Sequence, residues 1–275
     1  MTEEQTKRIG LVLGGGGARG LAHLGALGAL EERGFRPDAI AGASIGGVIG
    51  AMYSSGMDAG AIIRAFRELR QYELLDVGAK GGLIGGRRIE KKLSEYVRAC
   101  FEDLEVPLKV TAVDVQSGEL VILGSGPLVP ALRATSALPG ILSPAEHMGR
   151  HFLDGGLLNN LPVDVIRTMT YSPVVAVDVS APPNRRLDFE SHGVVPTIKK
   201  ITRRNFRNLT MELFMKSFDI PQALLTRVRL SMVPPHVLIR PRLDTDFGVE
   251  DFHRLDEAVD AGYQAACTAL TELAG

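Results

Sequence analysis

Two glycine-rich turns near the start of the chain, each between an apolar run and a helical pattern, constrain the fold most strongly. The apolar run Arg8–Gly14 ends in the glycines of LGGGGARG and precedes a pattern with leucine at every third position. The run DAIAG, residues 38–42, leads through GASIG into IGGVIGAMYSSG, residues 45–56. Short apolar runs bounded by glycine are typical of buried strands, and alternating strands and helices form parallel sheets covered by helices. The sequence therefore predicts an α/β fold with a mostly parallel sheet.

Further strands and helices are predicted along the rest of the chain. The strand patterns are PLKVTAVDVQSGELVILGSG, which reads as two strands around a Ser117–Gly118 turn, and RHFLDGG, SPVVAVDVS and HVLIRP. The helical patterns cover residues 57–72, 87–101, the first part of 127–140, and 251–273. A soft boundary near residues 180–193 separates a core of about 8–180 from a C-terminal part of about 190–275. We expect both parts to belong to one domain over residues 1–275.

Composition narrows the classes of function. The net charge is −1 and tryptophan is absent, which argues against a nucleic-acid-binding surface. The two cysteines, Cys100 and Cys267, lie outside any CxxC or Cys/His cluster, so we expect reduced thiols and no metal site. No run of about 20 apolar residues predicts a transmembrane helix, and the N-terminus lacks the pattern of a signal peptide. We therefore expect a cytoplasmic protein without a nucleic-acid partner.

GASIG, residues 42–46, matches the pattern Gly-x-Ser-x-Gly at a predicted strand-to-helix turn. In a nucleophile elbow the serine occupies a sharp, strained turn, and the flanking glycines leave room for close backbone contacts. Gly42 and Gly46 would supply that room around Ser44, beside the positive end of a helix dipole. An ordinary βα turn with Ser44 as the helix N-cap explains the same residues. The motif alone leaves both interpretations open.

Residues 15–20, GGGARG, also allow two interpretations. They match the G-x-G-x-x-G fingerprint of dinucleotide-binding folds, but that fingerprint requires an acid at the end of the second strand. The nearby acid, Asp38, lies before the apolar part of that strand instead. Consecutive glycines at a helix N-terminus also build an oxyanion hole, because their N–H groups can point to one spot. We favour the oxyanion hole, which would consist of Gly15, Gly16, Gly17 and Arg19.

A serine nucleophile needs a base to take its proton. Asp154 is the best-framed candidate, because it ends the predicted strand RHFLD and is followed by Gly155 and Gly156. A hairpin turn at Asp-Gly is the alternative, although LLNNLPV does not resemble a return strand. Burial in a dry cleft would raise the carboxyl pKa from its usual value near 4 and make the group a useful base. A histidine base remains the other possibility, with six candidates that lack such a frame: His23, His147, His151, His192, His236 and His253.

Four blocks of the sequence resemble, in the same order, those of the patatin-like phospholipase family. They are GGGARG at 15–20, GASIG at 42–46, ATSALPGILSP at 134–144 and DGGLLNNLPV at 154–163. The chain is similar to small bacterial members and to the catalytic domain of neuropathy target esterase. The blocks cover about the first 165 residues, and they depart from the family at Thr135, where many members have serine.

The resemblance implies a three-layer α/β/α fold with a mostly parallel central sheet. It implies a catalytic dyad of Ser44 and Asp154, with no histidine, that hydrolyses carboxylic esters in phospholipids or lysophospholipids without a metal or cofactor. Two other classes of function stay open. One is a dinucleotide-binding oxidoreductase, and the other is a catalytically silent protein that binds acyl lipids and regulates a partner.

Residues 199–230 carry eight basic and only two acidic side chains, interleaved with apolar ones. Such a segment is typical of a basic amphipathic helix that docks on anionic lipid. A packed helix with a solvated basic side is the alternative. We therefore keep peripheral contact with the inner face of a membrane as a hypothesis. The apolar residues that we expect on this face, between the basic ones, are Ile198, Ile201, Leu209, Leu213 and Phe218.

Overall fold

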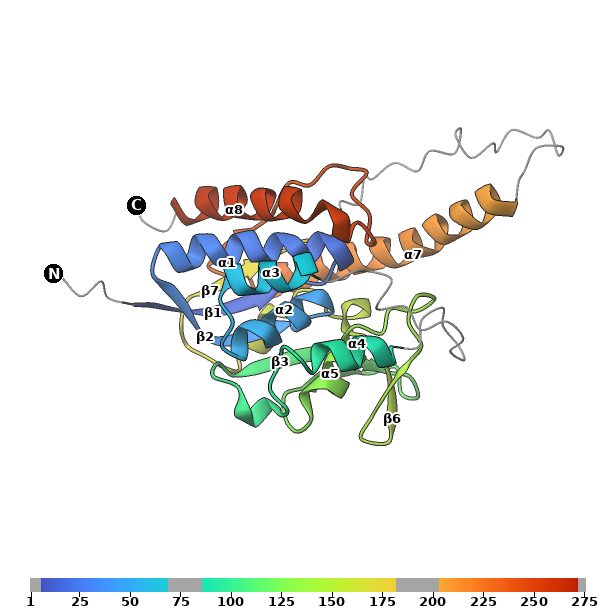
Figure 1. Cartoon of the computed structure of the whole chain (residues 1–275), viewed down its shortest axis with the longest axis horizontal. Helices are drawn as coiled ribbons and strands as arrows, with labels where there is room; N and C mark the ends of the chain where they lie inside the picture. The colour runs from blue at the N-terminus through green and yellow to red at the C-terminus, as the bar shows by residue number, and fades with distance from the viewer. Residues whose placement is uncertain (1–5, 69–85, 182–202, 272–275) are drawn as a thin grey trace.

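The computed structural model describes residues 6–68, 86–181 and 203–271, and in this part of the chain eight strands form one sheet (Figure 1). The order across the sheet is β5-β6-β3-β2-β1-β7-β8, and β4 also pairs with β3. Pairing is parallel from β3 through β2, β1 and β7 to β8, and antiparallel where β4, β5 and β6 take part. The strands are β1 (Lys7–Leu13), β2 (Phe35–Gly42), β3 (Leu108–Asp114), β4 (Leu120–Leu123), β5 (Ala145–His147), β6 (Arg150–Asp154), β7 (Val174–Val177) and β8 (Val237–Ile239).

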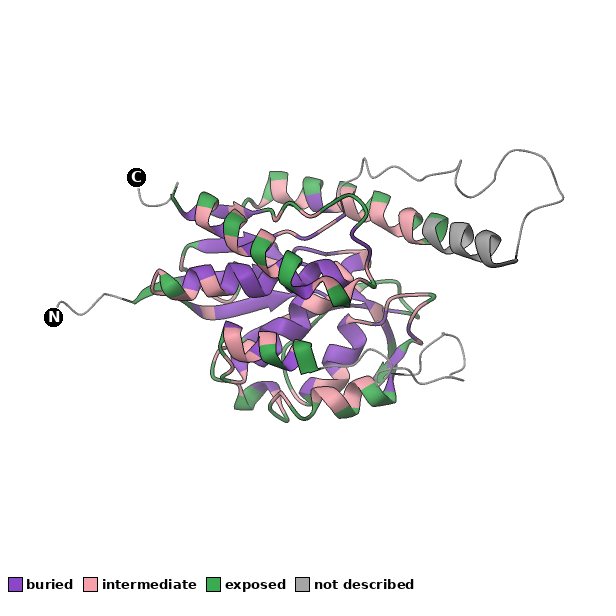
Figure 2. Ribbon diagram, turned by 45° about the horizontal axis from the view of Figure 1, so that its top comes forward, coloured by how far each residue is buried: buried purple, intermediate pink, exposed green. Residues whose placement is uncertain are grey.

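Helices cover both faces of this sheet. They are α1 (Ala22–Glu32), α2 (Ile45–Ser54), α3 (Ala59–Glu68), α4 (Arg87–Leu93), α5 (Leu128–Thr135), α6 (Val163–Ile166), α7 (Arg203–Met232) and α8 (Leu255–Thr271). Leu11 and Leu13 of β1 pack into a core with α1, α2, α3, α5 and α8. Val12, which points to the other face, packs into a second core with α6 and Leu230 of α7. The expected three-layer α/β/α fold is therefore confirmed, with its most buried residues in the central strands (Figure 2).

The strand registers bring the two glycine turns and Asp154 to one edge of the sheet. Leu13 of β1 pairs with Gly42 of β2, so the segments that follow these parallel strands leave the sheet side by side. Gly42 pairs in turn with Val110 of β3, and Ala112, two residues further on, pairs with Asp154. Because β6 runs antiparallel to β3, its last residue reaches the same edge from the opposite direction.

Two local predictions differ from the structure. The helix expected over residues 87–101 ends at Leu93, and no residue of α4 is buried, so tertiary packing gives its apolar face little support. The hairpin of β5 and β6 was not predicted. Its two-residue turn is Met148-Gly149, with φ of 52° and 74°, and a methionine at positive φ is not a recognised turn signal.

The C-terminal part joins the same architecture as the N-terminal part. β8 extends the sheet beside β7, and α8 packs along α1 (Figure 1). The two helices cross closely, because a Cβ added at Gly25 would overlap the carbonyl oxygen of Val259, and one added at Gly262 would overlap that of Ala22. The soft boundary expected near residues 180–193 falls outside the described residues, except for its first two positions.

Candidate active site

Ser44 lies on a strained turn between β2 and α2. Its φ of 52° and ψ of −127° place a non-glycine residue in a region that L-amino acids rarely adopt. The turn is possible because the neighbouring glycines touch backbone. A Cβ added at Gly42 would come within 2.7 Å of the main chain of Gly47, and one added at Gly46 would overlap the carbonyl oxygen of Leu13. The turn therefore has the sharp strand-to-helix geometry that a nucleophile elbow requires.

The hydroxyl of Ser44 is used for a side-chain contact and not for helix capping. Ser44 occupies the N-cap position of α2, yet its side chain makes no capping bond. Its Oγ donates instead to Oδ2 of Asp154 at 2.7 Å, across 110 positions of sequence. Its N–H donates to Oγ1 of Thr135 at 2.9 Å. The expected contact between Ser44 and Asp154 is therefore present.

Asp154 is a buried carboxylate held by the start of a short 3-10 helix. Its Oδ1 accepts the N–H of Gly156 at 2.8 Å, while Oδ2 faces Ser44. Gly155 packs directly on the main chain of Thr111, which leaves no space for a side chain there. Burial raises the pKa of Asp154 from 3.8 to about 6, although the hydrogen bonds from Ser44 and Gly156 oppose that rise. The group is thus a carboxylate near neutral pH, with an unusually high proton affinity.

Gly15, Gly16 and Gly17 of the glycine loop line the same small cavity as Ser44 and Asp154. The N–H of Gly15 donates to the carbonyl oxygen of Asn160 at 3.2 Å, so it is already engaged. Among the described residues nothing accepts a hydrogen bond from the N–H of Gly16 or Gly17. Gly17 has a φ of 57°, and a Cβ there would come within 2.6 Å of the carbonyl oxygen of Val249. Of the four residues expected to form an oxyanion hole, Gly16 and Gly17 are those with available donors.

Arg19 connects the glycine loop to neighbouring segments of the structure. Its guanidinium is almost fully buried, and Nε donates to the carbonyl oxygen of Val179 at 3.2 Å. Asp219 of α7 lies 4.0 Å from its terminal nitrogen. Arg19 therefore ties the glycine loop to the segment after β7 and to α7, rather than presenting a mobile charge to solvent.

Three residues support the site through contacts that their sequence patterns did not specify, and His23 among them was one of the six candidate bases. Thr135 accepts the Ser44 N–H, a bond that serine could also make, so the departure from the family pattern keeps the hydroxyl. Asn160 donates through Nδ2 to the carbonyl oxygen of Gly15 at 3.0 Å. His23 is fully buried and donates from Nε2 to the carbonyl oxygen of Gly14 at 2.7 Å, and burial lowers its pKa to about 4. The sequence shows the Asn-Asn pair and a histidine after the glycine loop, but it does not identify their partners, because these are main-chain carbonyl oxygens.

The model of the patatin-like phospholipase family matches residues 11–167, which is more than half of the chain and includes the serine turn, the glycine loop and Asp154. The chain belongs to the patatin-like phospholipase family. The resemblance seen in four short blocks is thereby confirmed.

Curated relatives within this family are longer than the chain. An uncharacterized NTE family protein of Mycobacterium tuberculosis is 31% identical over 96% of this chain and 46% of that protein. Lysophospholipase NTE1 of Pyricularia oryzae is 29% identical over 97% of this chain and 19% of that protein. The chain thus spans about half or less of the length of these relatives. Among solved structures, VipD from Legionella pneumophila matches at 15% identity with a TM-score of 0.49, over 98% of this chain and 67% of that one.

The alternative of a histidine base is not supported by any contact with Ser44 in this patatin-like site. His192 lies outside the described residues, and none of the other five histidines hydrogen-bonds to Ser44. His236 instead accepts the N–H of Val174 through Nδ1 at the start of β8. In the described part of the chain, no three His, Cys, Asp or Glu side chains gather as metal ligands would.

The dinucleotide alternative also lacks its acid. Asp38, the candidate, bonds through Oδ2 to the hydroxyls of Thr170 and Ser172. Asp38 lies midway along β2, next to Ala39, which pairs with Gly10, whereas the glycine loop follows the carboxyl end of β1. Asp38 thus lies away from the edge of the sheet at which the loop begins.

Helix α7 covers the patatin-like site. Met215, Phe218 and Gln222 of this helix line a cavity of about 40 Å³ that also contacts Ser44 and Asp154. Gln222 donates from Nε2 to the carbonyl oxygen of Gly156 at 3.0 Å, which ties the helix to the Asp-Gly-Gly segment. The cavity has space for about one water-sized group. None of the helices in the described residues has the length and apolar character that crossing a bilayer would require.

Proposed function

We propose that the protein is a serine lipid acyl hydrolase in which Ser44 is the nucleophile and Asp154 the base, acting on carboxylic esters of phospholipids or lysophospholipids. The observation that carries this proposal is the 2.7 Å bond from Ser44 Oγ to a buried carboxylate whose pKa is about 6. A base with a pKa near the working pH is both deprotonated and able to take a proton. Membership of a phospholipase family and the lysophospholipase among the relatives support the substrate class.

The reaction has two halves. Ser44 Oγ attacks the ester carbonyl carbon as its proton moves to Oδ2 of Asp154. The resulting oxyanion accepts hydrogen bonds from the N–H groups of Gly16 and Gly17. When the tetrahedral intermediate collapses, the carbon–oxygen bond of the alcohol breaks, and the alcohol leaves with the proton from Asp154. Asp154 then takes a proton from water, which attacks the acyl-enzyme, and the fatty acid leaves as Ser44 regains its proton.

The oxyanion donors are set before substrate arrives. Asn160 and Arg19 hold the loop through the carbonyl oxygens of Gly15 and Val179, so the N–H groups of Gly16 and Gly17 need little reorganisation. Removing one such donor in other hydrolases typically lowers the rate about 10²–10³-fold. Admission of an acyl chain requires Met215 and Phe218 to move, because the cavity beneath them holds only about 40 Å³.

Labelling with a fluorophosphonate tests the proposal directly. The probe should form one covalent adduct, and mass spectrometry should map it to Ser44, because only this serine contacts both a buried carboxylate and the glycine loop among the described residues. Ser44→Ala should lose both the label and the hydrolysis of a chromogenic acyl ester. Ser125→Ala, at an exposed serine, is the matched control and should keep both. Turnover in Ser44→Ala, or an adduct elsewhere, would contradict the assignment, and a silent lipid-binding protein would take no label.

We further propose that α7 contacts the lipid surface through its outer side. Ile220, Leu224 and Val228 recur every four residues and are 56%, 54% and 48% exposed. They lie on the same side of the helix as exposed Leu213, opposite to the residues that line the small cavity. Phe218, expected on this outer side, lines the cavity instead. Ile198, Ile201 and the side chain of Leu209 lie outside the described part.

A further inference from the structure

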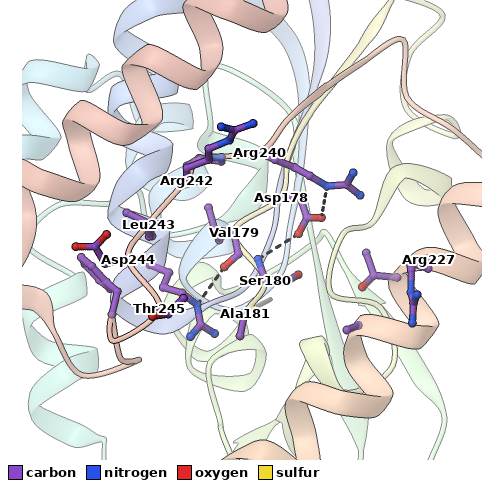
Figure 3. A pocket seen from close by; sticks show the side chains of 15 residues that line it. Asp178, Val179, Ser180, Ala181, Arg227, Arg240, Arg242, Leu243, Asp244 and Thr245 are labelled. Carbon is purple, nitrogen blue, oxygen red and sulfur yellow. Dashed lines mark hydrogen bonds and ion pairs between the residues drawn. The ribbon is translucent and has the colours of Figure 1, made fainter. Parts of the chain in front are cut away.

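A second cavity, of about 470 Å³, lies beside the small one between α7 and the segments that follow β7 and β8 (Figure 3). Its volume is within the range of small-molecule sites, about 300–1,000 Å³. Arg19 borders both cavities, so the two spaces adjoin at this buried side chain. The apolar part of the lining includes Val179, Leu243 and Phe247.

The charges that face this cavity are mainly positive. Four arginines line it against two aspartates, which are Arg19, Arg227, Arg240 and Arg242 against Asp178 and Asp244. Both aspartates already have cationic partners. Asp178 accepts from Arg240 at 3.2 Å, and Asp244 lies 3.6 Å from Arg254, which is outside the lining. The cavity therefore retains positive charge that its own acids do not balance.

Arg240 and Arg227 approach the cavity from two separate elements. Arg240 follows β8, and its Nε donates to Oδ2 of Asp178, which orients the guanidinium group (Figure 3). The two terminal nitrogens of Arg240 make no hydrogen bond or ion pair with any described residue. Arg227 comes from α7 and has no ion pair or hydrogen bond within the described part of the chain (Figure 3). Thr226, next to it, is 5% exposed, and its hydroxyl has no described partner. Two guanidinium groups and one buried hydroxyl are thus available to a ligand.

We propose that this cavity binds the phosphate group of the lipid, with Arg227 and Arg240 as its ligands. Arginine offers planar, paired donors that match phosphate oxygens, and it does so better than a point charge. The inference rests on the proposed function, because an ester carbonyl at Ser44 and a phosphate past Arg19 are only a few bonds apart in a glycerophospholipid. The substrate class is then a phosphate-bearing acyl ester, and neutral acylglycerols are poorer substrates.

Two substrates that differ only in the phosphate test this assignment. The wild-type protein should hydrolyse 1-oleoyl lysophosphatidic acid with a higher kcat/KM than 1-oleoylglycerol, both in mixed detergent micelles. Arg227→Gln and Arg240→Gln should each lower the ratio of the two kcat/KM values by about tenfold or more, mainly through KM for the phosphate-bearing substrate. Arg64→Gln, at an exposed arginine of α3, is the control and should keep the wild-type ratio. An unchanged ratio in both cavity variants, or an equal loss on both substrates, would overturn the proposal.

A binding measurement separates this proposal from the catalytic one. Ser44→Ala protein, titrated by calorimetry, should bind 1-oleoyl lysophosphatidic acid at least tenfold tighter than 1-oleoylglycerol, and adding Arg227→Gln should remove the difference. If the wild type hydrolyses neither ester but this difference persists, the proposed function fails and the phosphate site stands. Equal binding of the two lipids would mean that the phosphate adds nothing to the affinity, which would overturn the site. Inorganic phosphate that binds as tightly as the lysolipid would assign the cavity to free phosphate and would overturn its head-group role.

Discussion

At Asp154, burial and hydrogen bonding act on the carboxyl pKa in opposite directions. Burial favours the protonated form, whereas the hydrogen bonds from Ser44 and from the Gly156 N–H favour the carboxylate. Burial prevails and leaves the pKa at about 6, above the value of 3.8 for an ordinary aspartate. Because Asp154 must be deprotonated to act as a base, activity should decrease as the pH falls through this pKa.

We expect kcat/KM to fall about tenfold per pH unit below pH 6 and to level off above it, because the free enzyme's base is lost by protonation. The measurement is hydrolysis of a soluble short-chain ester between pH 4.5 and 8. Circular dichroism over the same range is the control, since it separates protonation from unfolding. A profile that stays flat down to pH 4.5 would contradict the role given to Asp154.

The site residues that are flanked by characteristic glycines could be predicted from the sequence. Those whose contacts depend on how the strands pair could not. The glycines around Ser44 and after Asp154 predicted which hydroxyl and which carboxylate would meet, and that contact is present. Thr135 and Asn160 reach main-chain atoms 91 and 145 positions away. Nothing in their local sequence specifies these partners, because strand order and register decide them. The catalytic roles of all these residues stay predictions.

At the scale of the elements, the turn that carries Ser44 packs against β1 through Gly46, and the structure leaves no space for a side chain at that position. Gly46→Ala would force a methyl group into the carbonyl oxygen of Leu13, which is backbone and cannot rotate away. We expect this change to destabilise the fold by about 3 kcal/mol and to abolish labelling of Ser44. Urea denaturation and fluorophosphonate labelling are the measurements.

Gly28→Ala is the matched control for that substitution. Gly28 lies inside α1 with nothing within 4 Å of an added Cβ. Alanine there should stabilise the protein by about 0.5–1 kcal/mol, because glycine is a poor residue in a helix interior. If both variants lost stability equally, the close contact at Gly46 would not be the cause.

Elements with a strong period and clear ends were predictable, whereas those decided by tertiary contacts were not. β1, β2, α1, α2 and α8 appear close to their expected positions. α4 is shorter than its apolar pattern indicated, since its face is not buried. The β5–β6 hairpin depends on pairing with β3 and on a turn that the residue types do not announce.

For the whole molecule, the position of α7 connects the site with the proposed lipid surface. One side of the helix faces Ser44 and Asp154, and the other exposes Ile220 and Leu224. Ile220→Glu and Leu224→Glu should each lower partitioning onto anionic vesicles by about tenfold, because a charge replaces an apolar side chain at the interface. Vesicle flotation measures this, with Val115→Glu, at another exposed apolar residue, as the control. Equal flotation of all variants would dismiss the contact.

The single domain expected over residues 1–275 stays a prediction that two observations support. β8 belongs to the same sheet as the N-terminal strands, and α8 shares a core with α1, α2 and α3. Both elements follow the soft boundary near residue 180, so the C-terminal part is not a separate unit among the described residues.

The close crossing of α1 and α8 has a consequence for how the polypeptide is made. Ala22 follows the glycine loop by two positions, and its carbonyl oxygen lies directly against Gly262, with no side chain between the two backbones. During synthesis, the segment that carries the loop leaves the ribosome long before Gly262 and the rest of α8 do. A nascent chain therefore lacks the packing that completes this region until α8 has also been made.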